Sequence, residues 1–308
     1  MNTNQLLKHS RAFALFVVLF FASSLSAETI RVASYNLYNY LDANRWVEGH
    51  YRMAYPKPEA EKAAARKVIA AVHPDILTLQ EIGGPLHLQE LQTDLKKAGV
   101  DYPYAECLIG PDEDRRIAVL SKIPFEAVGH TELDFKYFDG RELIKRGLLE
   151  LRFGKGDTAW TLFVVHLKSR WTTRDDDPES GKRRTGEAHA ARNFIREQYP
   201  PETNPRYLVV GDFNDTKRSA PIRRFLEVGD TQLTQLLPAG DSRGEAWTFH
   251  YRAEDKYERV DFILASPALA PFVEGGETHI YDSQPETSNA SDHRLIYVDL
   301  SNLPRSGG

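Results

Sequence analysis

One segment, residues 207–215 (Y-L-V-V-G-D-F-N-D), constrains the fold most, because it joins a short apolar strand directly to a group of polar side chains. Its first four residues are aromatic, β-branched or leucine, which is typical of a buried strand, and Gly211 permits a sharp turn of the backbone. Asp212 and Asn214 are two residues apart, so in an extended backbone both side chains leave the same face. A carboxylate beside a carboxamide can hold a cation or a proton and can donate to developing negative charge. This pair favours a site for a phosphate oxygen or an attacking water.

G-D-F-N-D alone is also a common turn sequence, so this segment by itself does not distinguish a functional site from a simple turn. The ends of the other predicted strands make this distinction. Apolar segments typical of strands end at Asn36, Glu81 and His166, whereas two later strands, 259–265 and 293–300, have their polar residues at the beginning. If the last two strands run antiparallel to the others, all these polar residues lie along one edge of a mixed α/β sheet system, where ligands usually bind. The residues concerned are Asn36, Glu81, His166, Asp212, Asp261, Asp292 and His293.

Apolar residues at helical spacing predict helices over residues 59–72, 88–95, 187–198 and around 222–226. The segment 170–186 is predicted to be a long polar loop, and loops of that length are often functional or mobile. Its charges favour either a solvated mixed-charge loop or an arm that contacts a phosphate backbone. The basic residues of this segment are Arg170, Arg174, Lys182, Arg183 and Arg184.

The N-terminal 27 residues have the order of a secretory signal peptide. Lys8 and Arg11 precede an apolar run over residues 12–22, which is too short to span a bilayer comfortably, and small residues follow it. We therefore expect a secreted or periplasmic protein. The remaining chain has no linker or repeat, which predicts one domain over residues 28–303 and a short tail over 304–308.

The charge balance is acidic, with a formal net charge of -5 for the 308 residues. An acidic exported protein has no general attraction to nucleic acid, so a polyanion must be met by a local basic patch and by bound metal. Cys107 is the single cysteine, which excludes an internal disulfide and leaves stability to the core.

The polar residues at the strand ends suggest a hydrolytic site. Asn36, Glu81 and Asp292 offer hard oxygen ligands, few enough to leave water on the ion, as Mg²⁺ is usually held. His293 with Asp261 on a neighbouring strand resembles an acid that orients an imidazole. Each feature also has a structural interpretation: Glu81 as an exposed acid, Ser-Asp-His as a turn and His166 as a core histidine. Arg146 is similarly either a surface charge or a fork that grips phosphate.

Taken together, seven motifs in order along the chain resemble the endonuclease/exonuclease/phosphatase superfamily, which has the fold of the pancreatic-type deoxyribonuclease (DNase I-like). They are S-Y-N-L (34–37), L-Q-E-I (79–82), R-G-L-L-E-L (146–151), V-V-H-L-K-S (164–169), G-D-F-N-D (211–215), R-V-D-F-I-L (259–264) and S-D-H-R (291–294). The resemblance implies an α/β fold of the α+β type, a four-layer sandwich in which helices flank two packed mixed β-sheets. It also implies Mg²⁺ as the cofactor, with Mn²⁺ or Ca²⁺ as alternatives.

The resemblance assigns roles to individual residues. It implies metal ligation by Asn36, Glu81 and Asp292, and it implies phosphate binding by Arg146, to which we add Arg170 from the basic segment. Asp114 is a candidate for the acid that orients the first histidine. The catalytic residues that it implies are His166, Asp212, Asn214, Asp261 and His293.

Two departures from the family narrow the expected activity. Tyr38 stands where abasic-site repair enzymes carry Asp, and the segment K-Y-E-R-V-D lacks the Trp-Cys pair of inositol-polyphosphate phosphatases. The H-L-K-S motif followed by a basic segment is more similar to secreted bacterial nuclease-like members. We predict a secreted Mg²⁺-dependent phosphodiesterase, an endonuclease that acts on DNA or RNA as a monomer, without a stable protein partner or membrane contact. The alternatives are a sphingomyelinase-like or other small phosphoester hydrolase and a non-catalytic binding module.

Overall fold

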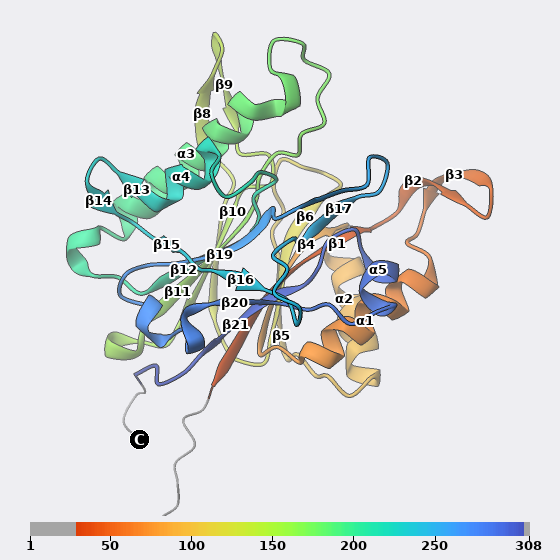
Figure 1. Cartoon of the computed structure of the whole chain (residues 1–308), viewed down its shortest axis with the longest axis horizontal. Coiled ribbons are helices and arrows are strands. Elements are labelled where there is room, and N and C mark those ends of the chain that lie inside the picture. Colours follow the sequence, from red (N-terminus) through yellow and green to blue (C-terminus); the bar gives the residue numbers. More distant parts are fainter. Residues whose placement is uncertain (1–28, 305–308) are drawn as a thin grey trace, which may run out of the picture.

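Apolar runs of the sequence form two β-sheets in the computed structural model, which describes residues 29–304 (Figure 1). The first sheet contains, in spatial order, β16 (Ala239–Gly240), β20 (Thr278–Ile280), β21 (Ile296–Leu300), β1 (Ile30–Tyr40), β4 (Ile76–Ile82), β6 (Arg116–Ser121) and β5 (Tyr104–Cys107). The second contains β15 (Gln235–Leu236), β19 (Asp261–Ala265), β12 (Tyr207–Asp212), β11 (Trp160–His166), β10 (Leu148–Phe153) and β7 (Glu126–His130).

The side-chain alternation of the strands explains why the sheets pack as they do. Along β12, Leu208 and Val210 enter the core between the two sheets, whereas Tyr207 and Val209 enter a second core on the opposite face. Neighbouring residues of a strand point to opposite faces, so a strand that is apolar at every position must be covered on both sides. The predicted burial of this strand is confirmed.

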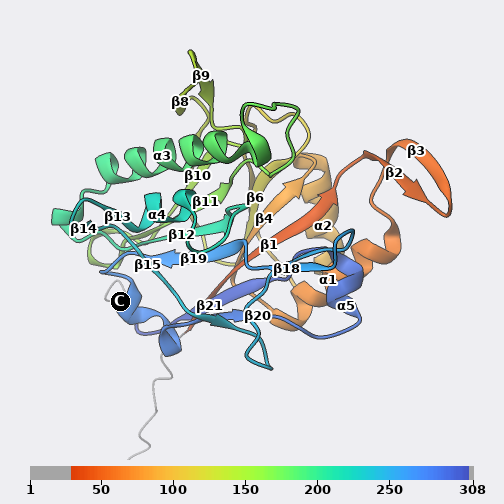
Figure 2. The ribbon, with the colours of Figure 1, turned by 45° about the horizontal axis from the view of Figure 1, so that its top comes forward.

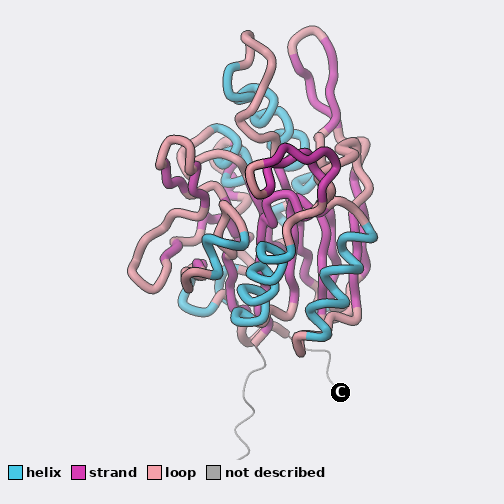
Figure 3. The backbone as a smooth tube through the Cα atoms, turned by 90° about the vertical axis from the view of Figure 1, so that its right-hand side faces the viewer, coloured by secondary structure: helices cyan, strands magenta, loops and turns pink. Residues whose placement is uncertain are grey.

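Helices supply the outer cover of each sheet. The first sheet packs against α1 (Glu59–Val72), α2 (Pro85–Lys97) and α5 (Glu286–Ala290), which face the viewer in front of the strands in Figure 3. The second sheet packs against α3 (Gly181–Gln198) and α4 (Ala220–Leu226), and Figure 2 shows α3 lying across β10, β11 and β12. The order helix, sheet, sheet, helix is the predicted four-layer sandwich.

Strand direction brings the polar strand ends to one edge. β1 and β4 are parallel, as are β11 and β12, whereas β21 is antiparallel to β1 and β19 is antiparallel to β12. The ends of β1, β4, β11 and β12 therefore meet the beginnings of β19 and β21. The predicted arrangement of the last two strands is confirmed.

The remaining elements are hairpins and short 3₁₀ helices. Hairpins are formed by β2 (Ala43–Val47) with β3 (His50–Tyr55), β8 (Asp134–Tyr137) with β9 (Gly140–Leu143), β13 (Glu227–Val228) with β14 (Thr231–Gln232), and β17 (Phe249–Tyr251) with β18 (Lys256–Glu258). Short 3₁₀ helices span Gly156–Thr158, Pro178–Ser180, Pro201–Thr203, Ala270–Phe272 and Glu274–Gly276. The β2–β3 and β8–β9 hairpins project from the body of the molecule (Figure 1).

The predicted start of the third helix is wrong. α3 begins at Gly181 rather than Glu187, so Lys182, Arg183 and Arg184 lie on a helix and not on a loop. The buried carboxylate of Asp177 accepts hydrogen bonds from the backbone N–H groups of Lys182 and Arg183, at 2.8 and 3.0 Å. It thereby satisfies donors of the first turn that have no partner within the helix.

The predicted signal peptide, residues 1–27, lies outside the described residues, as do residues 305–308 of the predicted tail. Across residues 29–304, no helix combines the length and the apolar character needed to cross a membrane.

Candidate active site

Three strands of the second sheet place three catalytic candidates side by side. His166 is paired with Asp212 in the parallel register of β11 and β12, and Asp212 is paired with Asp261 in the antiparallel register of β12 and β19. All three side chains are buried. Adjacent strands lie about 4.8 Å apart, so this register alone brings the imidazole and both carboxylates into one group.

Asp212 and Asn214 converge, but through a turn rather than through an extended strand. β12 continues through Gly211 to Asp212, and the backbone turns at Asn214, where φ is +53°. The backbone N–H of Asn214 donates to Oδ1 of Asp212 at 2.8 Å, and its side-chain amide donates to Oδ2 at 3.0 Å. Gly211 is required for a different reason than a turn, since a Cβ there would lie 2.0 Å from the carbonyl oxygen of Val165.

Asn36 connects the first sheet to this group. Its side-chain amide donates to Oδ2 of Asp212 at 3.0 Å, and its own Oδ1 accepts from the backbone N–H of Tyr38 at 3.0 Å. The hydroxyl of Ser291 donates to the backbone carbonyl of Asn36 at 2.8 Å. These contacts join the ends of β1, β12 and the segment before β21.

Glu81 is displaced from the regular strand. The register of β4 shifts between Gln80 and Ile82 against both neighbouring strands, and Glu81 itself has φ +61°. A bulge of this kind redirects a side chain, and a positive φ in a residue other than glycine is often found at functional sites. Oε2 of Glu81 accepts from the backbone N–H of Asn39 at 2.9 Å, and Oε1 lies 4.0 Å from Nε2 of His166.

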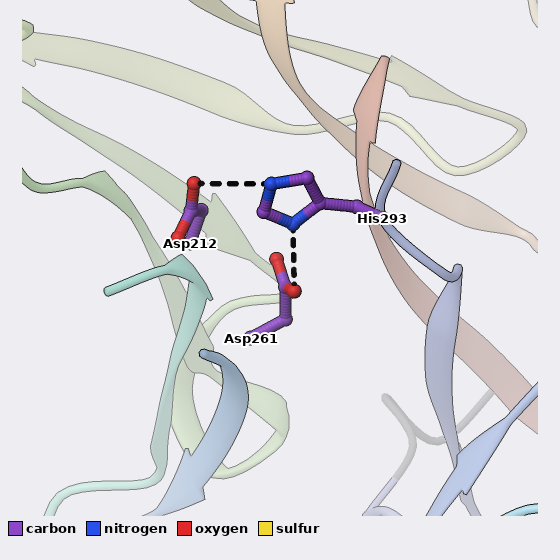
Figure 4. A group of neighbouring side chains, drawn as sticks. All are labelled: Asp212, Asp261 and His293. Atoms are coloured by element: carbon purple, nitrogen blue, oxygen red, sulfur yellow. Dashed lines mark hydrogen bonds and ion pairs between the residues drawn. The ribbon is translucent and has the colours of Figure 1, made fainter. Parts of the chain in front are cut away.

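His293 is held between two carboxylates (Figure 4). Its Nδ1 lies 2.9 Å from Oδ2 of Asp261, and its Nε2 lies 3.9 Å from Oδ2 of Asp212. Burial opposes a charge on the ring, but Asp261 and Asp212 raise the pKa of His293 well above its usual value. Burial raises the pKa of Asp212 to about 7. The ring is therefore suited to donate as an imidazolium, and Asp212 is suited to exchange a proton near neutral pH.

His166 has the opposite character. Burial, followed by the nearby charges of Arg146 and His293, lowers the pKa of His166 well below its usual value, so the ring is neutral. Its Nε2 lies 3.6 Å from Oδ2 of Asp212, whereas its buried Nδ1 has no hydrogen-bond partner among the described residues. The candidate pairing of His166 with Asp114 is not formed, because the carboxylates near Nε2 of His166 are those of Glu81 and Asp212, and Nδ1 has no hydrogen-bond partner among the described residues.

Carboxylates also gather on the first-sheet side of the site. Burial and the nearby charge of Glu81 raise the pKa of Asp292 to about 6, although His293 acts in the opposite direction. A cation would relieve this accumulation of negative charge. Within residues 29–304, Asp212, Asp261 and His293 also form a cluster whose ligand atoms lie within 4.8 Å of one another and could hold a metal ion.

Acidic and basic residues line one cleft of about 510 Å³. Arg146 is buried there, with Nε 2.9 Å from Oδ2 of Asp112 and a terminal nitrogen 3.5 Å from the carbonyl oxygen of Leu167. Arg115, Lys145 and Lys168 line the same cleft. Burial and the charge of Arg146 lower the pKa of Lys168 to about 8.

Most of the predicted site residues come together at this cleft. Its lining includes Glu81, Arg146, Asp212, Asn214, Asp292 and His293. Asn36, His166 and Asp261 are buried and contact these residues directly. Arg170 does not join them, because its guanidinium is paired with Glu258 at 2.6 Å outside the described cleft lining.

The sequence analysis did not identify two carboxylates, Asp112 and Glu187, that contact the site residues from outside the cleft lining. Asp112 pairs with Arg146, and the fully buried Glu187 accepts from the backbone N–H groups of Lys145 at 3.2 Å and Lys168 at 2.7 Å. Glu187 falls on the inward stripe of α3, four residues before Ala191, and a carboxylate on an apolar stripe could have identified it. Three aromatic side chains also line the cleft, those of Tyr38, Trp171 and Phe249.

Comparisons with known proteins identify a family and solved structures to which this chain is similar. The family model described as the Endonuclease/Exonuclease/phosphatase family matches residues 33–293. A search of curated proteins gave no match. Solved structures with a similar fold include sphingomyelinase C from Streptomyces griseocarneus, which has a TM-score of 0.58 and 16% identity, with 89% of this chain and 100% of that chain covered.

Two further structures share the fold at similarly low identity. The human nocturnin catalytic domain with bound sulfate has a TM-score of 0.59 and 16% identity, covering 89% of this chain and 94% of that chain. A beta toxin variant from Staphylococcus aureus with bound magnesium ions has a TM-score of 0.60 and 14% identity, covering 89% of this chain and 100% of that chain. The match over residues 33–293 shows that this chain belongs to the endonuclease/exonuclease/phosphatase family, whose members hydrolyse phosphoester bonds.

Proposed function

We propose that this chain is a secreted, Mg²⁺-dependent endonuclease that hydrolyses internal phosphodiester bonds of DNA or RNA. The observation that carries the proposal is a single cleft that is lined by both carboxylates and cations. Its lining includes Glu81, Asp212 and Asp292 together with Arg146 and Lys168. A phosphodiester held between a metal and a guanidinium would have charge stabilised from two directions, as in-line displacement requires.

Asn36, Glu81 and Asp292 fit a magnesium ion by the chemistry of their donor atoms. They offer oxygen ligands, and a cation bound beside them would stabilise the charged form of the buried Asp292 carboxylate, whose pKa is raised by burial and by the nearby charge of Glu81. Bound there, Mg²⁺ would act as a Lewis acid on a phosphoryl oxygen. We assign the Asp212, Asp261 and His293 cluster to proton transfer instead, because Asp261 already bonds to His293 and Oδ2 of Asp212 already accepts from two amides.

The remaining chemistry follows from the chain's own residues. Asp212, held by the amides of Asn36 and Asn214, orients a water molecule and accepts its proton as the water oxygen attacks phosphorus. The P–O bond opposite this water breaks, and the leaving oxygen takes a proton from solvent. His293, oriented by Asp261, donates as an imidazolium to a phosphoryl oxygen as negative charge develops. Arg146 binds another oxygen through its fork. The neutral ring of His166 fills the floor of the site beside Asp212 without adding a charge.

Two features of the cleft favour a polynucleotide. Four cationic side chains line it, and a strand with neighbouring phosphates would offer phosphate oxygens to more than one of them: Arg115, Lys145, Arg146 and Lys168. Aromatic side chains at the cleft offer faces on which bases can stack, and Trp171 is 74% exposed there. We also propose that the protein acts as a monomer, without a stable protein partner.

A second candidate is a phosphodiesterase of the sphingomyelinase type. The observation in its favour is a set of exposed aromatic and apolar side chains on the hairpin that follows β1 and at the cleft itself. Trp46 is 72% exposed and Met53 is 77% exposed on the β2–β3 hairpin, in addition to Trp171. Aromatic side chains of this kind also suit the interface of a membrane.

A substrate panel separates these candidates. The mature protein would be offered plasmid DNA, RNA, sphingomyelin vesicles and a chromogenic phosphodiester, each with Mg²⁺, Mn²⁺, Ca²⁺ or a chelator. We expect metal-dependent cleavage of nucleic acid and of the chromogenic diester. Release of phosphocholine with intact nucleic acid would favour the second candidate, and no turnover of any substrate would favour a binding module.

A further inference from the structure

A group of arginines without acidic partners lies on α3 and α4, outside the lining of the catalytic cleft. Arg192 and Arg196 belong to α3, and Arg223 and Arg224 belong to α4. In the part of the chain that the structure describes, none of the four forms an ion pair, and the charges acting on Arg192 come from other arginines. Four unpaired guanidinium groups are unexpected in a chain whose formal net charge is -5.

The basic residues that the sequence suggested for polyanion binding are different ones, and the four arginines among them are paired with carboxylates. Arg170 pairs with Glu258 at 2.6 Å, Arg174 with Asp176 at 2.7 Å, and Arg184 with Asp215 at 2.9 Å. Arg183 pairs with Glu142 at 3.2 Å. An anion from solution would have to compete with these carboxylates, whereas Arg192 is paired with no carboxylate in residues 29–304.

Arg192 is the centre of the unpaired group. Its side chain is only 5% exposed, and its buried Nε has no hydrogen-bond partner among residues 29–304. One terminal nitrogen lies 3.1 Å from Nδ1 of His189. Burial, together with Arg196 and Arg224, lowers the pKa of Arg192. A buried cation without a counter-charge is costly, so an anion bound beside it would be stabilising.

A pocket of about 340 Å³ lies at this position. Arg192, Arg223 and Arg224 line it, together with small and apolar residues that include Ala220. Glu227 also lines the pocket, but in the described structure its carboxylate pairs with none of the three arginines. The volume accommodates a phosphate group with associated water.

We propose that this pocket is a second binding site, separate from the catalytic cleft, for a tetrahedral oxyanion of the phosphate class. Arg192 holds the anion from within the pocket, and Arg223 and Arg224 close over it from α4. The anion is either free inorganic phosphate or a phosphate of a polynucleotide strand. Anion binding at this site requires no turnover, so a test of this binding is independent of the proposed nuclease activity.

The test uses His189 as a local reporter, because its ring contacts Arg192. The imidazole signals of the full mature protein would be followed by NMR during titration with sodium phosphate at constant ionic strength, with chelator present. The His189→Gln variant assigns the signals. We expect a saturable shift of the His189 signals, and we expect Arg223→Ala combined with Arg224→Ala to weaken phosphate binding about tenfold or more.

A matched control removes the same charge elsewhere. Lys155 and Lys217 are exposed, form no ion pair in the described structure and do not line the pocket, so Lys155→Ala with Lys217→Ala should bind phosphate like the wild type. Both double variants change exposed side chains, and circular dichroism would check that they fold. Absence of a saturable shift in the wild type, or equal affinity in the wild type and the arginine variant, would overturn the proposal.

A second titration identifies the source of the anion. A short single-stranded oligonucleotide that displaces phosphate at His189, and whose uncharged methylphosphonate analogue does not, supports a strand phosphate. Failure of the oligonucleotide to displace bound phosphate supports free phosphate as the ligand of the same site.

Discussion

Nδ1 of His293 lies 2.9 Å from Oδ2 of Asp261, and both side chains are almost completely buried. This hydrogen bond fixes the orientation of the ring, so that Nε2 faces Asp212 and the cleft. Asp261 thereby gives His293 both a direction and a charge. The proposed mechanism depends on this pair, because a neutral ring in the same position would be a much weaker stabiliser of phosphoryl charge.

The first prediction concerns this pair. Asp261 raises the pKa of His293, so Asp261→Asn should lower that pKa, and the imidazolium should be lost at a lower pH. The alkaline limb of the kcat profile on a chromogenic phosphodiester should move to lower pH, with a reduced maximum. A profile of the variant that overlays the wild type would show that His293 does not depend on Asp261.

A second prediction addresses the metal. Glu81→Ala should reduce kcat by about 10² or more and should raise the Mg²⁺ concentration at half-maximal activity, because a carboxylate ligand is lost. Glu48→Ala is the matched control, since Glu48 is exposed at the tip of the β2–β3 hairpin and does not line the cleft. The measurement is activity as a function of Mg²⁺ concentration. If kcat and the Mg²⁺ concentration at half-maximal activity are unchanged in Glu81→Ala, Glu81 is not part of the site.

A third prediction assigns a positioning role to Glu187. Its two carboxylate oxygens accept from the backbone N–H groups of Lys145 and Lys168, on the two segments that carry Arg146 and follow His166. Glu187→Gln offers only one acceptor oxygen, so kcat should fall about tenfold, the loss expected for one hydrogen bond to a charged group.

A double-mutant cycle tests whether Glu187 acts through Arg146. In an Arg146→Lys background, the further change Glu187→Gln should cost much less than it does in the wild type. Glu197→Gln, an exposed change on the same helix, is the control. Additive losses in the cycle would mean that Glu187 supports only the general fold.

A fourth prediction follows from the ion pairs of the basic segment. Arg174 is exposed and paired with Asp176, so its charge is already neutralised locally. Arg174→Ala should leave both the rate of polymer cleavage and its salt dependence unchanged within about twofold, since an exposed ion pair contributes little. A clear reduction of the salt slope with polymer, but not with a small diester, would restore the expected arm that contacts the phosphate backbone.

Much of the fold could be predicted because its signals are local. Strands that are apolar on both faces and polar at one end require helices on each side and a common polar edge, as Leu208, Val209 and Asp212 illustrate. The start of α3 could not be predicted in the same way. Its first turn is polar, and its stability there comes from the Asp177 carboxylate, which the apolar periodicity does not report.

The sequence predicted which residues gather at the cleft and predicted the pairing of His293 with Asp261, but it did not predict the other pairings. The sequence places Asp212 and Asn214 correctly, yet the turn that joins them depends on a side-chain hydrogen bond to a backbone N–H. Partners far apart in sequence, such as Arg146 with Asp112 and Arg170 with Glu258, decide which cations are available to a substrate. Sequence alone shows the charges and leaves this three-dimensional neutralisation undetermined.

The most direct test of the central claim is the conversion of supercoiled plasmid DNA by the wild type and by His293→Asn. We expect the wild type to produce nicked and then linear plasmid with Mg²⁺ and to leave the plasmid supercoiled with chelator. His293→Asn should bind the plasmid but cut it about 10² times more slowly, the loss expected when one preorganised charge-stabilising donor is removed. A wild-type protein that leaves plasmid DNA and RNA intact with every cation, while it releases phosphocholine from sphingomyelin vesicles, would contradict the assignment as a nuclease.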